Sequence, residues 1–446
     1  MTQPISRRAF LQLSAAGAAA AYTGACASAP KRKITSGRVR YAAIATGGMG
    51  GVDLENIASH PDVDVVALCD IDSGRLEAAG QKYPGARLYQ DWRKLLRAEA
   101  GKIDAVSVST PDHMHAPIGM SALAMGLHVY GQKPLTHTVV EARTLRAAAR
   151  RAGTATQMGI QNRSNTPYLT ALSAFESGVT GPVTEVHVWT DRPAGWWPQD
   201  VDRPEGEDPV PAELDWDGWL GVAPARPYKK DTYHAFVWRG RKDFGTGAQG
   251  DMACHLMDPA LWFLGLGDPL LVRSEGPKPK ADSFPAWSRI VCEFGPTAAT
   301  APQRIPVTWY DGKQQPSELF ARYQVKNPYA NASLFVGPKG ALLVSPYEPC
   351  RFFTLENGES DLGLTEVPKV NHWHQWVDAC LGRCDTTAPF EYSGLLTEVA
   401  LLGNVALEFP GESLVWDGPG LRFPGRPDAS KLLHKTYRKG WEVAGL

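Results

Sequence analysis

The chain has 446 residues, of which 43% are hydrophobic and 21% are charged, and its formal net charge at pH 7 is −1. A single core does not usually extend through so long a chain, so we expect two domains. The near-neutral charge argues against nucleic acid or an anionic membrane surface as a partner. Beyond the N-terminal segment, no apolar run approaches the roughly 18 residues of a membrane-spanning helix. The expected partner is therefore a small molecule.

Residues 1–36 are predicted to be an export leader and a linker. The stretch SRRAFL, which begins at Ser6, places two arginines before a moderately apolar run rich in Ala and Gly. This is the twin-arginine pattern, and it predicts delivery of the protein to the periplasm. The segment is compatible both with simple cleavage between Ala25 and Ala29 and with a lipid anchor at Cys26.

Between residues 37 and 161, short apolar segments alternate with helical ones. Buried strands are predicted at 39–45, 63–69, 103–109, 127–131 and 154–160, and helices at 50–59, 73–82, 92–98, 116–124 and 139–152. This alternation is typical of a parallel sheet with helices on both faces. We therefore expect a doubly wound α/β domain in this part of the chain.

Residues 162–446 are richer in aromatic residues and proline. The stretch DRPAGWWPQDVDRPEGEDPVP, residues 191–211, has no helical or strand period and predicts a long structured loop. Strands are predicted at 183–190, 288–294, 305–310 and 341–345, and helices at 373–381 and 392–408. The second domain is therefore expected to be α+β.

The stretch AIATGGMGG follows the first predicted strand and opens a helix. Ala45, Gly47 and Gly50 occupy the three glycine positions of the dinucleotide-binding fingerprint. Gly47 would allow the backbone to approach a pyrophosphate, and the start of the helix offers unpaired N–H groups to it. Alanine disfavours positive φ, so either the turn is altered at Ala45 or Gly48 and Gly51 absorb the strain.

Asp70 ends the second predicted strand, about 20 residues beyond the glycines. A carboxylate in this position accepts hydrogen bonds from the adenosine ribose and repels a 2′-phosphate, which favours NAD over NADP. Arg75 is close enough in sequence to reverse that preference.

Three further motifs lie at strand ends and in the second half of the chain. They read STPDHMHA, HVYGQKPLTHT and DFGTGAQGDMACHLMD. Together they resemble the Gfo/Idh/MocA family, which includes glucose–fructose oxidoreductase and inositol dehydrogenase, and WDGWLGVAPARPY with FVWRGRKDFGTGA resembles its exported bacterial branch. The resemblance extends from Val39 nearly to the C-terminus. It implies an N-terminal Rossmann domain, a C-terminal α/β domain whose open antiparallel sheet forms homo-oligomers, and NAD(P)-dependent oxidation of a sugar or polyol.

The resemblance also implies the catalytic residues. Lys133 stands in the family's Glu-Lys-Pro motif and would lie beside the nicotinamide and the reacting hydroxyl group, although Gln132 replaces the glutamate and leaves open how the lysine is held. The family's Asp-x-x-x-His pair becomes Asp251 and His255. The two residues are four positions apart and share one helix face, so the carboxylate would orient the imidazole. The imidazole is expected to act as a base of near-neutral pKa.

The cofactor is expected to be NAD or NADP, tightly bound. The residues expected to bind it are Ala45, Gly47, Gly48, Met49, Gly50, Asp70, Arg75, Thr110, Pro111, His115, Gln132, Lys133 and Gln161. No metal site is expected, because the two histidines of STPDHMHA have no carboxylate at ligand spacing. Further polar candidates for the pocket are Arg192, Tyr233, His234 and Arg239, together with one or two tryptophans.

Three functions follow from these features. An exported enzyme would keep its cofactor and regenerate it in each cycle, either by transferring the hydride between a sugar or polyol and a second carbonyl compound, or by redox-neutral hydrolysis of a glycoside through transient oxidation of the sugar. The third function is sugar binding without turnover. Either enzyme requires Lys133 and His255 to reach one pocket, whereas the binding protein does not.

Overall fold

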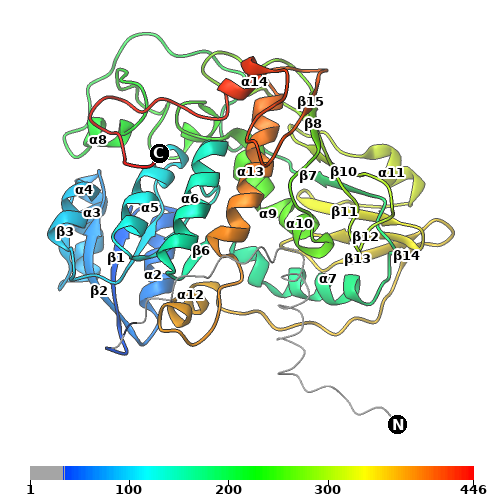
Figure 1. Cartoon of the computed structure of the whole chain (residues 1–446), viewed down its shortest axis with the longest axis horizontal. Coiled ribbons are helices and arrows are strands. Elements are labelled where there is room, and N and C mark those ends of the chain that lie inside the picture. The colour runs from blue at the N-terminus through cyan, green and yellow to red at the C-terminus, as the bar shows by residue number, and fades with distance from the viewer. Residues whose placement is uncertain (1–33, 35) are drawn as a thin grey trace.

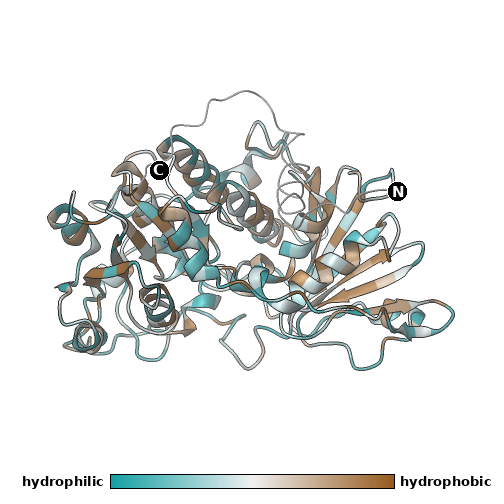
Figure 2. Ribbon diagram, turned by 90° about the horizontal axis from the view of Figure 1, so that it is seen from below, coloured by the Kyte–Doolittle hydropathy of each residue, from teal (hydrophilic) through white to brown (hydrophobic). Residues whose placement is uncertain are grey.

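The computed structural model describes residue 34 and residues 36–446, so the predicted leader, with its arginine pair and Cys26, lies outside the described residues. The described chain forms two lobes, each built on one sheet (Figure 1). Apolar strands lie inside both lobes, and their surface helices carry hydrophilic faces (Figure 2). No described helix combines the length and the hydrophobicity needed to cross a membrane.

The N-terminal sheet confirms the predicted doubly wound domain. Its six strands are all parallel, in the order β3-β2-β1-β4-β5-β6. They are β1 (Val39–Ile44), β2 (Val63–Cys69), β3 (Arg87–Tyr89), β4 (Ala105–Val108), β5 (His128–Gly131) and β6 (Thr156–Met158). The helices between them are α2 (Met49–Ala58), α3 (Ser73–Lys82), α4 (Trp92–Ala98), α5 (His115–Ala124) and α6 (Val139–Ala152).

The side chains of β1 point alternately to the two faces of this sheet and show how each face is covered. Val39, Tyr41 and Ala43 point into an apolar cluster with α2 and α3, whereas Ala42 and Ile44 point into the cluster that contains α4, α5 and α6. A strand that is buried on both faces is a continuous apolar run in the sequence, and these runs are what predicted the strands.

The C-terminal sheet has nine strands in the order β14-β13-β12-β11-β7-β10-β9-β8-β15. They are β7 (Glu185–Trp189), β8 (Leu271–Glu275), β9 (Arg289–Phe294), β10 (Ile305–Tyr310), β11 (Ala332–Gly337), β12 (Gly340–Val344), β13 (Arg351–Thr354), β14 (Gly358–Ser360) and β15 (Ser413–Val415). Neighbouring strands are antiparallel except β7 and β10, which run parallel. The expected antiparallel sheet is therefore a mixed, mostly antiparallel one.

Helices and 3-10 turns complete the second half. The helices are α7 (Thr166–Glu176), α8 (Trp216–Leu220), α9 (Gly247–Leu256), α10 (Asp258–Leu264), α11 (Ser317–Arg322), α12 (His372–Cys380), α13 (Phe390–Ala406) and α14 (Pro427–Lys431). The 3-10 turns are η1 (Asp112–Met114), η2 (Gln161–Ser164) and η3 (Val237–Gly240). Residues 191–211 contain neither a helix nor a strand, as their composition predicted.

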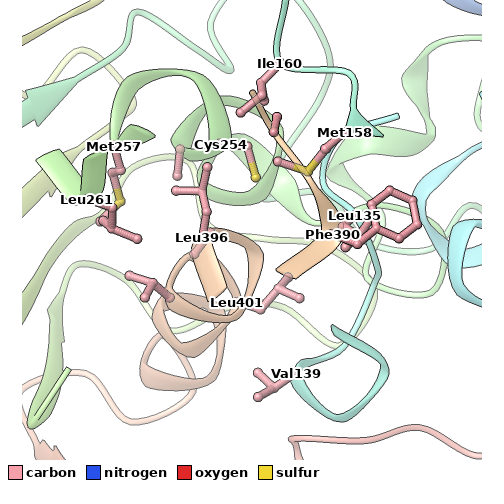
Figure 3. Packing of buried hydrophobic residues seen from close by; sticks show 14 of the residues in the cluster. Leu135, Val139, Met158, Ile160, Cys254, Met257, Leu261, Phe390, Leu396 and Leu401 are labelled. Carbon is pink, nitrogen blue, oxygen red and sulfur yellow. The ribbon is translucent and has the colours of Figure 1, made fainter. Parts of the chain in front are cut away.

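Helix α13 joins the two lobes. It packs against α6 of the first lobe and against α9 of the second, with Leu396 and Leu401 in the same apolar cluster as Met158 and Cys254 (Figure 3). Helix α12 also returns to the first lobe, where the ring of Trp376 lies edge-on near the ring of Tyr41. One apolar core therefore crosses between the lobes and fixes the cleft that separates the sheets.

Candidate active site

A cavity of about 470 Å³ lies at the carboxyl ends of the parallel strands. Ala45 follows β1, Asp70 follows β2, Thr110 follows β4 and Lys133 follows β5, and all four line it. The chain reverses its strand order between β1 and β4, which is where open parallel sheets bind ligands. The opposite wall, from the second lobe, includes His255.

The cavity brings together nearly every residue that the sequence placed at the cofactor or in catalysis. Of those candidates, the residues that line it are Ala45, Gly47, Gly48, Met49, Asp70, Arg75, Thr110, Pro111, Gln132, Lys133, Gln161, Asp251 and His255. Gly50 and His115 lie behind the wall.

The glycine turn is shaped to receive a phosphate group. The backbone N–H groups of Gly47, Gly48 and Met49 donate to no acceptor among the described residues, and they gather at the start of α2. A Cβ atom on Gly50 would lie 2.4 Å from the carbonyl oxygen of Ala45, so glycine is needed there for the close approach of helix to strand. This turn therefore fits a dinucleotide pyrophosphate.

Strain in this turn is carried by Ala45 itself. Its φ is 72°, in the left-handed region, and Gly48 has a φ of 54°. Of the two alternatives, an altered turn at Ala45 or relief by Gly48 and Gly51, the alanine itself adopts the positive φ, and Gly51 lies within helix α2. The cost is about 1–2 kcal/mol for an L-residue.

The adenosine end of the cavity holds one carboxylate and one guanidinium. Asp70 accepts hydrogen bonds from the backbone N of Thr46 at 2.8 Å and the backbone N of Asp72 at 3.1 Å, which fixes the carboxylate with lone pairs left for ribose hydroxyl groups. Arg75 lies across Gly47, and its Nε is 3.5 Å from a carboxylate oxygen of Asp72.

Lys133 is held by Asp251 of helix α9. Its Nζ donates to Asp251 Oδ1 at 2.6 Å and to the Asp251 carbonyl oxygen at 2.9 Å. The lysine side chain is 14% exposed and the aspartate side chain is 6% exposed. The question raised by the missing glutamate is thereby answered, because the anchor of the lysine comes from the other lobe.

Gln132 has a different partner. Its Nε2 donates to Asp53 Oδ2 at 2.9 Å, while its Oε1 accepts from the backbone N of Lys133 at 3.2 Å. Asp53 is fully buried on α2 and also accepts hydrogen bonds from Ser109 and Trp373. Burial raises the pKa of Asp53 to about 6, against the effect of these three donors. A glutamate at position 132 would face this carboxylate, whereas the glutamine amide satisfies it.

Asp251 does not orient His255 as we expected. Besides Lys133, its carboxylate accepts from Arg192 Nη1 at 3.0 Å and from Arg239 Nε at 3.1 Å. Burial opposes ionisation of Asp251, but the three cations outweigh it and hold the pKa well below its usual range. No hydrogen bond joins Asp251 to the imidazole within the described residues.

His255 is a neutral base in a positively charged pocket. Burial, together with the charges of Lys133 and Arg192 and against the effect of Asp251, lowers the pKa of His255 to about 3. The near-neutral pKa expected from the sequence is therefore wrong. Nδ1 of His255 is 3.4 Å from Nδ2 of Asn162, and Nε2 has no hydrogen-bond partner among the described residues.

His115 supports the wall instead of lining the cavity. Its two ring nitrogens each lie 2.7 Å from a carbonyl oxygen, one of Thr110 and one of Pro134. Burial lowers the pKa of His115 to about 4. The ring thus links the loop after β4 to the loop after β5. Among the described residues, no group of three or more His, Cys, Asp and Glu side chains is placed to hold a metal ion.

Residues 213–239, which include WDGWLGVAPARPY and the start of FVWRGRKDFGTGA, form a further wall of the cavity. We call residues 213–239 the strap. It pairs with the first lobe through the Asp72–Leu214 bridge and through Ser73 N, which donates to the Glu213 carbonyl oxygen at 2.8 Å. From the strap, the residues that line the cavity are Gly218, Trp219, His234, Ala235, Phe236, Trp238 and Arg239. Only its tryptophans and polar side chains hinted at this position.

Arg438, near the C-terminus, fastens the strap to the tail. Its Nε donates to the Gly221 carbonyl oxygen at 2.9 Å and its Nη2 donates to the Asp217 carbonyl oxygen at 2.8 Å. The tail returns to the first lobe, where the Arg93 guanidinium lies 3.8 Å from the centre of the Trp441 ring. The strap is therefore fastened within residues 213–221, both to the first lobe and to the C-terminal tail.

Comparisons with known proteins agree with this architecture. Residues 39–160 match the family described as "Oxidoreductase family, NAD-binding Rossmann fold", and residues 177–299 match its "C-terminal alpha/beta domain". Inositol 2-dehydrogenase of Rubrobacter xylanophilus is 29% identical over 156 residues, 34% of this chain and 44% of that protein. D-apiose dehydrogenase of Paraburkholderia graminis is 38% identical over 109 residues, 24% of this chain and 28% of that protein. The chain therefore spans less than half the length of these two relatives.

Among solved structures, the aldose-aldose oxidoreductase of Caulobacter crescentus, complexed with glycerol, superposes with a TM-score of 0.60 at 17% identity. The match covers 85% of this chain and 100% of that chain, and at this identity it establishes the shared fold.

Proposed function

Because the chain belongs to the Gfo/Idh/MocA family of oxidoreductases, we propose that it transfers a hydride between a secondary hydroxyl group of a sugar or polyol and a nicotinamide dinucleotide held in the cavity. The observation that carries the proposal is that Lys133 and His255, from opposite lobes, line the same cavity as the glycine turn. The relatives named for inositol and apiose support a polyhydroxylated substrate.

The protein's own groups handle the proton and the charge. When bound, the dinucleotide supplies the hydride acceptor. Neutral His255 accepts the hydroxyl proton at Nε2, its unpartnered nitrogen, in the tautomer that carries the ring N–H at Nδ1; the amide of Asn162 then turns its oxygen towards Nδ1 to accept from it. Lys133, fixed by its two hydrogen bonds to Asp251, donates to the same substrate oxygen and stabilises the negative charge that develops on it.

The strap supports tight retention of the cofactor, and Asp70 supports NAD. Residues 213–239 form one wall of the cavity, so we propose that they slow the release of the dinucleotide enough for it to survive purification. The Asp70 carboxylate lines the cavity and would repel a 2′-phosphate bound beside it, and Arg75 is near Asp72, which offsets its charge. Denaturing the purified protein and separating the released nucleotide by chromatography would identify it; NADP would overturn the NAD assignment.

The test of function uses the purified protein with a panel of sugars, polyols and aryl glycosides. Hydride transfer predicts reduced nicotinamide, followed by its absorbance, with a single substrate. In the Lys133→Met variant the rate is expected to fall roughly 10²–10³-fold, because the charge that stabilises the alkoxide is lost. Lys94→Met, which removes an exposed lysine on α4, is the matched control.

The other outcomes separate the alternatives. Release of the aryl group without net reduction would indicate redox-neutral glycoside hydrolysis. Bound nucleotide with neither reaction, across the whole panel, would indicate a binding protein without turnover and would overturn the proposal.

Export and assembly are further proposals that rest on the leader and on the family resemblance. Replacing Arg7 and Arg8 by lysine is expected to abolish export, as measured by fractionation of periplasm and cytoplasm. Light scattering of the purified protein tests the expected homo-oligomer, and a monomer at all concentrations would contradict it.

A further inference from the structure

Positive charge is concentrated where the substrate would lie. Lys133, Arg192 and Arg239 surround the single carboxylate of Asp251, and all four side chains line the cavity beside His255. Asp251 can balance only one of the three cations.

The next carboxyl group does not correct this imbalance. Asp112 also lines the cavity, but it is buried, its side chain accepts a hydrogen bond from Thr246 at 2.7 Å, and burial raises its pKa to about 7. Burial therefore disfavours the charged form of Asp112. Even with Asp112 ionised, three cations face two carboxylates, so an excess of one positive charge remains in a partly enclosed site, where Coulomb interactions are stronger than in water.

Both guanidinium groups are stacked on aromatic side chains. Arg192 lies 4.0 Å from the ring centre of Trp196, and Arg239 lies 4.2 Å from that of Phe236 and 4.4 Å from that of Trp238. Arg192 bonds Asp251 through Nη1, and its Nε and Nη2 have no hydrogen-bond partner among the described residues. Arg239 bonds Asp251 through Nε and the Phe236 carbonyl oxygen through Nη1, which leaves only its Nη2 without a partner there. The Nε–Nη2 edge of Arg192 suits the planar, two-oxygen geometry of a carboxylate, and Arg239 can add one further hydrogen bond.

We propose that the substrate is a sugar acid, whose carboxylate is bound by Arg192 and Arg239 while its reacting hydroxyl group lies against Lys133 and His255. This inference rests on the proposed function and names the substrate class of the same site. A bound carboxylate would also offset the positive charge that disfavours the imidazolium of His255, so the anionic substrate would strengthen the base that acts on it.

The experiment compares matched pairs of ligands, such as methyl glucoside with methyl glucuronide and sorbitol with gluconate, on the protein with its cofactor bound. Two quantities are measured: the dissociation constant, from quenching of tryptophan fluorescence, and kcat/KM. The carboxylate member of each pair is expected to bind at least about 10-fold more tightly than the neutral member.

Variants test which residues make that distinction. Arg192→Met and Arg239→Met are each expected to reduce the carboxylate-to-neutral affinity ratio about 10-fold or more. Arg192→Lys is expected to restore only part of this ratio, because lysine keeps the positive charge but lacks the paired N–H donors of the guanidinium group. Arg97→Met, which removes an exposed arginine on α4, should leave the ratio unchanged. If Arg239→Met fails to fold, the Arg192 variants alone decide the result.

Failure of this inference and failure of the proposed function give different results. Equal or better binding of neutral sugars, an unchanged ratio in the Arg192 variants, or a preference for sugar phosphates over carboxylates would overturn the inference while oxidation of sugars continued. A clear carboxylate preference with no hydride transfer to any ligand would instead overturn the proposed function and leave the anion site in place.

Discussion

Replacing Gln132 by glutamate, which restores the family's residue, is expected to destabilise this protein. The amide nitrogen of Gln132 is 2.9 Å from Asp53 Oδ2 in a fully buried position, so a glutamate would bring a second carboxylate against the first. Like charges at this distance do not both ionise. The native Gln132→Glu variant would then keep one extra proton at pH 7, whereas the unfolded chain would not.

The magnitude follows from linkage between protonation and folding. Holding a proton on a glutamate whose unfolded pKa is about 4.3 costs about 1.36 kcal/mol for each pH unit above that value, which is up to about 3.7 kcal/mol at pH 7 and about 1 kcal/mol near pH 5. The native variant binds more protons than its unfolded state, so its deficit relative to the parent grows as pH rises. Urea unfolding at several pH values between about 5 and 8 measures this deficit.

A second variant tests the same reasoning. In Asp53→Asn/Gln132→Glu the donor and the acceptor exchange places, so most of the lost stability should return. Gln314→Glu, at an exposed position, is the control and should change stability little. A Gln132→Glu variant as stable as the parent at pH 7, a deficit that does not change with pH, or a double variant no better than the single one would refute the argument.

Four further predictions concern the turn, the base and the strap. Ala45→Gly should raise the free energy of unfolding by up to about 1 kcal/mol in thermal or urea unfolding, because glycine adopts a φ of 72° without strain, and a less stable variant would contradict this. Gly50→Ala should cost roughly 1–3 kcal/mol and remove bound nucleotide, since its Cβ would lie 2.4 Å from a carbonyl oxygen; full nucleotide content would count against it. Between about pH 8 and 5, kcat/KM should not fall through protonation of His255, because the imidazole becomes protonated only as pH falls towards its pKa of about 3. A decrease of kcat/KM below about pH 6.5 that disappears in His255→Gln would contradict the lowered pKa of His255. Arg438→Ala should speed nucleotide release about 10-fold in a dilution assay, and an unchanged release rate would show that the tail does not hold the strap.

The parallel sheet could be predicted because each buried strand is a continuous apolar run, and several candidate site residues, such as Ala45, Asp70 and Lys133, could be placed because they follow a strand closely. Strand β3 could not, since it has three residues and the side chain of Leu88 is 44% exposed. The face shared by Asp251 and His255 was correctly placed on a helix, but helical spacing does not reveal what the face contacts. Arg192 reaches Asp251 from an irregular stretch and Arg239 from the short 3-10 turn η3, and neither is long enough or regular enough to give a periodic pattern. Asp53 gave no signal, because a buried carboxylate on a helix looks like any other helix residue in sequence.

The fastening of the strap by Arg438 sets an order of events during synthesis. Every strand of both sheets precedes Arg438 in the chain, so the ribosome synthesises the glycine turn and all strands before the residue that fastens the strap. If the dinucleotide is held as tightly as we propose, we expect it to enter the cleft before Arg438 bonds to the strap.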